Sequence, residues 1–139
     1  MKNILFFLIP KKEVVFLNAH CSLKFALEVM EENGYSAIPL ISDKGRYAGT
    51  LTEGDLLWEF KNNPDLTFEN CNKFSLNDVR RRRKVKPARI NEPLEEIIHM
   101  SKQQNFIPVV DDDGVFIGII RRQEILDYLL NSNIELASV

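Results

Sequence analysis

The chain repeats itself. Pro39 and Pro108 lie 69 positions apart, and the same offset places Gly45 on Gly114, Gly49 on Gly118, Asp55 on Glu124 and Leu56 on Ile125. Upstream of the prolines the offset becomes 71, and it places Leu23, Ala26 and Leu27 on Leu94, Ile97 and Ile98. Self-similarity at a fixed offset is typical of a duplicated structural unit. We therefore expect two copies of one small unit, the second two residues shorter between its helix and its strand.

Each copy contains the pattern of an amphipathic helix. In the first copy, apolar residues recur at positions i, i+3, i+4 and i+7 from Leu23 to Met30, which is the spacing of a helix with one buried face. Ser22 stands where a side chain can cap the first turn. Gly34 is a natural stop for the same helix.

Two short apolar runs follow that helix, at residues 36–41 and 47–51, and the five residues between them include Gly45. Apolar runs joined by a short turn containing glycine are typical of a β-hairpin. The second copy has equivalent runs at residues 106–110 and 115–120. Adding an earlier strand (14–17 or 87–90) and a final helix (55–60 or 124–130) gives the order strand, helix, strand, strand, helix.

The sequence therefore predicts an α+β fold with two repeats. We expect the first to occupy residues 1–72, with an N-terminal strand or tight turn at residues 4–9 and a polar connector at residues 61–75, and the second residues 73–139. A three-stranded sheet leaves an apolar face uncovered. The two repeats should therefore pack together.

The composition is that of an ordinary soluble domain. Of 139 residues, 27% are charged and 45% hydrophobic, and the formal net charge is −2, so no broad basic field is available for nucleic acid or anionic lipid. Cys21 and Cys71 lack the spacing of a metal or redox pair. We expect both to be reduced, and the protein to be cytoplasmic.

The two hairpins carry a recognisable signature. Residues 35–41 (YSAIPLI) followed by 49–57 (GTLTEGDLL), and residues 105–111 (NFIPVVD) followed by 118–125 (GIIRRQEI), each resemble a cystathionine-β-synthase (CBS) repeat. The resemblance extends from Val14 to Leu130. It implies a Bateman module, in which two β-α-β-β-α repeats pack about a pseudo-twofold axis and two such modules commonly form a flat homodimer.

The resemblance also implies a function. Modules of this kind bind adenosine-containing ligands such as AMP, ADP, ATP or cyclic di-AMP as regulatory ligands, require no cofactor, and pass the bound state to a separate effector protein. We expect a regulatory sensor that is not an enzyme, because the chain has no nucleophile constellation and no glycine-rich phosphate loop. A CBS pair that has lost its ligand and serves only for interaction and dimerisation is the alternative.

Two clefts follow from the resemblance, each made of a helix start in one repeat and the strand before the proline in the other. One would contain Thr52 and Asp55 with Asn105, Phe106, Ile107 and backbone from residues 86–88. The other would contain Arg121, Arg122 and Glu124 with Tyr35, Ser36, Ala37, Ile38 and backbone from residues 15–17.

The residue types suggest different roles for the two clefts. The family places a glycine, a Thr or Ser and an Asp at the spacing of Gly49, Thr52 and Asp55, where a carboxylate and a hydroxyl can bond ribose hydroxyls; an ordinary helix cap is the alternative for Asp55. In the second repeat, Arg121 and Glu124 depart from that pattern. Arginine forks suit phosphate, although a solvated helix start is equally compatible with them.

Two other features allow more than one interpretation. The basic run at residues 80–84 could be a solvated or partner-facing turn, a source of ligand-phosphate contacts, or a nucleic-acid contact. Residues 111–113, three aspartates before Gly114, favour a hairpin turn over a metal site. We expect the apolar residues of the last helix in each repeat to form the dimer contact: Leu56, Leu57, Phe60, Ile125, Tyr128 and Leu129.

Overall fold

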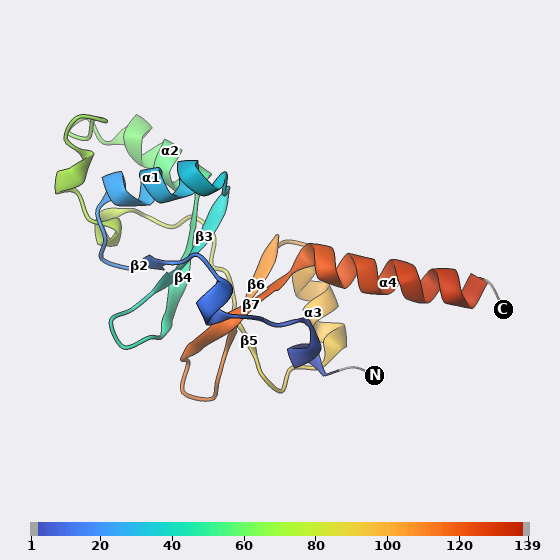
Figure 1. The fold of residues 1–139 in the computed structure, drawn as a ribbon. Helices are drawn as coiled ribbons and strands as arrows, with labels where there is room; N and C mark the ends of the chain where they lie inside the picture. Colours follow the sequence, from blue (N-terminus) through green and yellow to red (C-terminus); the bar gives the residue numbers. More distant parts are fainter. Residues whose placement is uncertain (1–2, 138–139) are drawn as a thin grey trace. The chain divides into compact units, whose positions relative to one another are not determined.

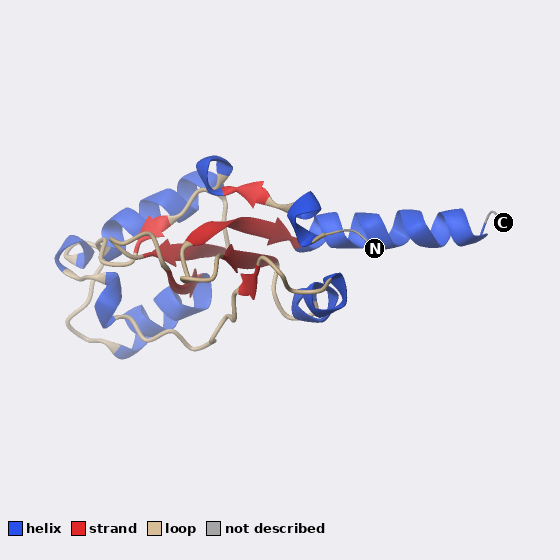
Figure 2. Ribbon diagram, turned by 90° about the horizontal axis from the view of Figure 1, so that it is seen from below, coloured by secondary structure: helices blue, strands red, loops and turns tan. Residues whose placement is uncertain are grey.

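The computed structural model describes residues 3–137, which divide into two compact units. One unit is made of residues 15–85 and contains the first repeat. The other joins the residues up to Val14 to those from Lys86 onward and contains the second. Both are α+β, as predicted, and Figures 1 and 2 follow the chain through their helices and strands.

The first unit has the predicted order strand, helix, strand, strand, helix. Its elements are β2 (Leu17–Asn18), α1 (Leu23–Asn33), β3 (Ala37–Ile41), β4 (Tyr47–Thr52) and α2 (Glu53–Asn62). The sheet order is β2-β3-β4, with β2 parallel and β4 antiparallel to β3. β4 is therefore an edge strand.

The ends of α1 lie where the sequence predicts them. The Ser22 hydroxyl accepts a hydrogen bond from the Phe25 backbone N–H at 3.1 Å, which satisfies one free donor of the first turn. Gly34 closes the helix in the left-handed conformation, with φ of 66°, where a side chain would be strained. The apolar stripe of the helix faces the core, because Leu23, Ala26 and Met30 are all buried.

The segment after α2 does more than connect the two repeats. It winds through the short turns η3 (Cys71–Lys73) and η4 (Leu76–Asp78), and four of its side chains belong to the first unit's core: Leu66, Cys71, Leu76 and Val79. The sequence shows no periodicity here because the buried residues are isolated among polar ones. Both cysteines are free thiols.

The second unit repeats the same topology. Its elements are β5 (Ala88–Arg89), α3 (Leu94–Ser101), β6 (Phe106–Val110), β7 (Phe116–Arg121) and α4 (Arg122–Ala137). β5 is parallel and β7 antiparallel to β6, with Pro108 opposite Ile119 just as Pro39 lies opposite Thr50 in the first unit. The two hairpins thus pair their strands in the same register, at the positions that the sequence repeat predicts.

The N-terminal segment lies against the second repeat, whereas we expected it to belong with the first in a unit of residues 1–72. It forms η1 (Ile4–Phe7), β1 (Ile9–Pro10) and η2 (Lys11–Glu13). β1 pairs antiparallel with β7, placing Ile9 opposite Ile119 and Pro10 opposite Gly118. Ile4 and Phe7 are buried in the second unit's core. The N-terminal segment is therefore held against the second repeat by its strand pairing with β7 and by the burial of Ile4 and Phe7, although β7 is distant in the sequence.

Two residues that we assigned to a dimer contact are core residues. Leu56 is 4% exposed and Ile125 is fully buried, so neither side chain is available to a partner. Leu57, on the same helix as Leu56, is 59% exposed. Phe60, Tyr128 and Leu129 are half-buried.

Gly118 tests the docking of the N-terminal segment. A Cβ at this position would lie 2.1 Å from the Ile9 carbonyl oxygen, whereas a Cβ at Gly114 would have no neighbour within 4 Å; both residues have positive φ, 156° and 82°. Gly114→Ala should therefore show backbone strain alone. Gly118→Ala should lower the free energy of unfolding by a further ~1–3 kcal/mol from steric overlap, measured by urea denaturation. Equal losses in the two variants would contradict the pairing of β1 with β7.

Candidate functional site

The predicted site residues of the first repeat meet at the corner where β4 becomes α2. Thr52 ends β4 and caps α2, and it pairs across the sheet with Ala37. The Glu53 backbone N–H donates to the Ser36 carbonyl at 2.9 Å, so Ser36 and Ala37 lie beside Thr52. Ile38 is fully buried in the core, and Tyr35 packs half-buried against the same core.

Asp55 is fixed by three hydrogen bonds within the first unit. Its backbone N–H donates to the Thr52 hydroxyl at 3.1 Å, and its carboxylate accepts from the Thr52 N–H at 3.0 Å. This reciprocal pair is a capping box. The other carboxylate oxygen accepts from the Arg82 backbone N–H at 2.9 Å.

Asp55 therefore has a structural role that sequence reasoning only partly anticipated. We considered it as an ordinary cap, whereas Thr52 is the capping residue and Asp55 completes the box from the third helical position. The carboxylate is 3% exposed, and each oxygen already accepts an N–H. Its role toward ribose stays a prediction.

The predicted site residues of the second repeat meet at the equivalent corner. Phe106 pairs across the sheet with Arg121, and the Arg122 N–H donates to the Asn105 carbonyl at 2.9 Å. The Arg122 side chain is used locally, since its Nε donates to the Gln104 carbonyl at 3.1 Å. Arg121, Glu124 and Asn105 are exposed, Phe106 is half-buried, and Ile107 is fully buried. Arg121 is thus the arginine whose charge faces solvent.

The structure brings the predicted residues together repeat by repeat. Tyr35, Ser36, Ala37 and Ile38 share a unit with Thr52 and Asp55, and Asn105, Phe106 and Ile107 share a unit with Arg121, Arg122 and Glu124. The two clefts expected from the resemblance each combine residues of both units, and they stay predictions.

A cavity that we did not anticipate lies at the open edge of β4. It measures about 390 Å³, and its lining joins residues of β4 to the basic segment that precedes the second repeat. The Tyr47 hydroxyl is hydrogen-bonded to the Thr50 hydroxyl at 2.7 Å and donates to the Val85 carbonyl at 3.2 Å. Burial raises the pKa of Tyr47 to about 12, against the opposing effects of Thr50 and of the Arg81 charge.

The aspartate run is explained by local structure. Asp111 accepts hydrogen bonds from the backbone N–H groups of Asp113 and Val115, so the aspartate run forms the hairpin turn that we expected. Within residues 3–137 no three His, Cys, Asp or Glu side chains gather as metal ligands would. In the same part of the chain, no helix is both long and apolar enough to cross a bilayer.

The family follows from a direct match. The model of the CBS domain matches residues 8–62 and 76–131, one match for each repeat. The chain therefore belongs to the CBS domain family, as a tandem pair of CBS repeats.

Curated relatives fall into two groups by length. A CBS domain-containing protein of Dictyostelium discoideum is 26% identical over 86% of both chains. The cyclic di-AMP receptor B of Bacillus subtilis is 25% identical over 88% of this chain and 83% of its own. By contrast, the chain spans only 42% of a Buchnera aphidicola magnesium and cobalt efflux protein CorC and 21% of a Helicobacter pylori inosine-5'-monophosphate dehydrogenase.

Solved structures show the same fold. The protein CbpB in complex with c-di-AMP superposes with a TM-score of 0.83 at 23% identity, covering 99% of this chain and 90% of its own. CBSX2 in complex with AMP gives a TM-score of 0.74 at 23% identity, covering 96% and 99%. At these identities the similarity establishes the CBS-pair fold.

The Asp55 hydrogen bonds predict a specific loss. Asp55→Asn replaces one carboxylate oxygen by an amide group, which leaves a buried N–H facing another donor. The free energy of unfolding should fall by about 1–3 kcal/mol, and the Arg82 amide should exchange with solvent faster. Asp78→Asn, at an exposed position of the same unit, should change neither. Unchanged protection of Arg82 in Asp55→Asn would show that the carboxylate does not hold this segment.

Proposed function

We propose that the protein is a regulatory CBS pair that senses an adenine nucleotide, either AMP, ADP or ATP or the cyclic dinucleotide cyclic di-AMP. It acts in the cytoplasm by binding and signals to a separate effector protein, with no catalytic step of its own. The observation that carries the proposal is the similarity, over most of both chains, to a relative named as a cyclic di-AMP receptor.

The second-repeat corner supports a phosphate-rich ligand. Arg121 and Asn105 are exposed there, beside a half-buried Phe106. A guanidinium fork can bond two phosphate oxygens at once, and an aromatic ring beside it offers a face for a base. The residue types alone favour a phosphate contact for both arginines. The local hydrogen bond of Arg122 to Gln104 leads us to assign that role chiefly to Arg121.

The first-repeat corner supports a different contribution. Its exposed Ser36 and half-buried Thr52 are neutral, and the Asp55 carboxylate is already engaged in the capping box. We propose that this corner contributes hydroxyl and backbone contacts, and that the two corners bind unequally.

Calorimetric titration of cyclic di-AMP and ATP into single variants tests this proposal. Arg121→Ala should weaken binding of the physiological ligand by roughly 10- to 100-fold, the effect of losing a charge-assisted hydrogen bond. Arg122→Ala should weaken it less and destabilise the fold. Lys102→Ala removes an exposed charge at the end of α3 and should leave affinity unchanged. If only Asp55→Ala weakened binding, the first-repeat corner would be the sensor.

A second candidate, a CBS pair that acts through dimerisation, is supported by an apolar groove. The groove measures about 630 Å³ and is lined by α1 and α2 of the first unit, including Leu27, Met30, Leu57 and Phe60, and by Phe68 from the segment after α2. Phe68 is 72% and Leu57 59% exposed. We propose that a second copy of the chain covers this groove, because the family resemblance implies dimers that meet through helices of this kind.

Sedimentation of the purified chain tests the dimer. Leu57→Asp should shift a micromolar dimer toward monomer, because burying a charge opposite apolar side chains is costly. Leu5→Asp, at an exposed apolar position outside the groove, should not. A monomeric wild-type chain, with and without nucleotide, would refute the dimer while leaving nucleotide binding open.

A further inference from the structure

The two repeats cover equivalent strand edges in different ways. In the second unit the edge of β7 is paired with β1, so that backbone atoms of Ile9 lie against Gly118. In the first unit β4 is an edge strand, and the equivalent Gly49 is covered by the side chain of Arg81. A Cβ at Gly49 would lie 2.8 Å from Arg81 Nε. A side chain fills less space than a strand, and the cavity of about 390 Å³ lies at this edge.

The basic segment that forms one wall of this cavity is held in place. The Arg82 N–H is bonded to the Asp55 carboxylate, and the Val85 carbonyl accepts from the Tyr47 hydroxyl. Arg81 Nη2 donates to the Ala48 carbonyl at 3.3 Å. Residues 80–84 therefore form an ordered strap beside β4, although their side chains are exposed. A charge held in position loses less conformational entropy when it binds a ligand.

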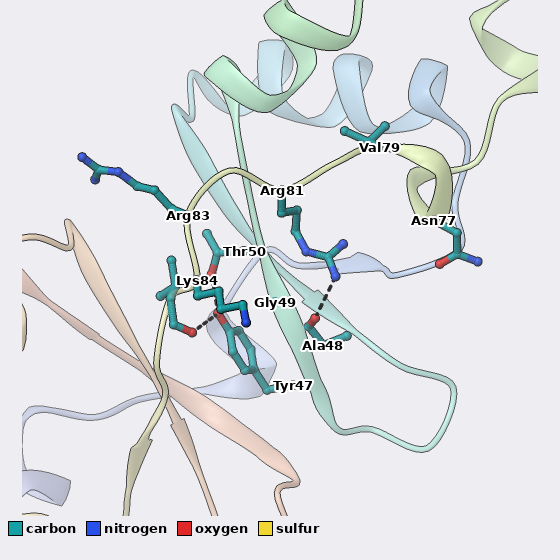
Figure 3. A pocket seen from close by; sticks show the side chains of 10 residues that line it. Tyr47, Ala48, Gly49, Thr50, Asn77, Val79, Arg81, Arg83 and Lys84 are labelled. Carbon is teal, nitrogen blue, oxygen red and sulfur yellow. Dashed lines mark hydrogen bonds between the residues drawn. The ribbon is translucent and has the colours of Figure 1, made fainter.

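Positive charge converges on the cavity. Figure 3 shows the side chains of Arg81 and Lys84 reaching over Tyr47 and Gly49, whereas Arg83 extends away from them. The lining contains no acidic side chain; its other polar groups are the Tyr47 and Thr50 hydroxyls and the Asn77 amide. The Arg81 charge also acts on the Tyr47 hydroxyl, because it opposes the rise that burial causes in the pKa of Tyr47.

We propose that this cavity is an anion site that binds the phosphate or pyrophosphate group of a small molecule. Arg81 and Lys84 supply the charge, and the Tyr47 and Asn77 side chains border the bound group. The volume falls in the range of about 300–1,000 Å³ found for small-ligand sites. The site lies wholly within the first unit and contains no residue of the two corners proposed above for the nucleotide. The basic run was considered above as a source of ligand-phosphate contacts, and the cavity gives this run an anion site of its own, which goes beyond the proposed function.

Titration with inorganic pyrophosphate tests the site. In an NMR titration, the backbone amide chemical shifts of Ala48, Gly49 and Lys84 should change. Calorimetry should show saturable binding whose affinity falls as the salt concentration is raised. Arg81→Gln/Lys84→Gln should reduce the affinity at least ten-fold, because two charge-assisted contacts are lost. Lys84→Gln alone should produce a smaller loss and serves as the readout if the double variant fails to fold.

The matched control is Lys44→Gln/Arg46→Gln. It removes the same two charges from exposed positions in the turn between β3 and β4 and should retain pyrophosphate binding. Equal losses in both double variants, or no amide shifts at Ala48 and Gly49, would overturn the inference. So would binding of single-stranded RNA through the strap with no effect of pyrophosphate. If pyrophosphate binds but no adenine nucleotide does, the anion site stands and the proposed sensor function fails; the reverse result rejects only the anion site.

Discussion

The carboxylate of Asp55 joins three parts of the first unit that are separate in sequence. It bonds the end of β4 at Thr52, stands in the first turn of α2, and accepts the Arg82 N–H of the strap. A buried carboxylate is stable only when hydrogen bonds replace its lost hydration, so all three parts must be in place together. The path of the strap, the cavity beneath it and the accessibility of the first-repeat corner all depend on this arrangement.

The two repeats have equivalent corners that carry different side chains. In the first repeat the corner residues are Thr52 and Asp55, tied into a capping box and a strap. In the second they are Arg121 and Glu124, both exposed. The strand edges differ in the same way, since β7 is covered by β1 and β4 by an arginine side chain. Two repeats of the same topology therefore differ in the side chains at their corners: exposed charged groups in the second, and a carboxylate engaged by backbone N–H groups in the first.

Most of the fold could be predicted from the sequence because the signals are local. Periodic apolar residues, Ser22 and Gly34 define α1, and the turn glycines define the hairpins. The docking of the N-terminal segment on β7 could not be predicted, because strand pairing between distant segments leaves no local pattern. The repeat motif predicted Thr52, Asp55 and Arg121 as site residues, and their roles in binding stay predictions. The hydrogen bond from Arg82 to Asp55 could not be predicted, because a backbone N–H donates whatever the residue type. The cavity at β4 could not be predicted either, because its lining comes from two segments that are distant in the sequence.

A thermal-shift screen of the full chain tests most directly whether this CBS pair binds an adenine nucleotide, as we propose. A ligand that binds only the folded state raises the melting temperature in proportion to the logarithm of its excess over Kd. We expect at least one of AMP, ADP, ATP and cyclic di-AMP to raise the melting temperature in a saturable way, and the matching guanine nucleotides to have little effect. No shift with any adenine nucleotide, or equal shifts with the guanine series, would contradict the account.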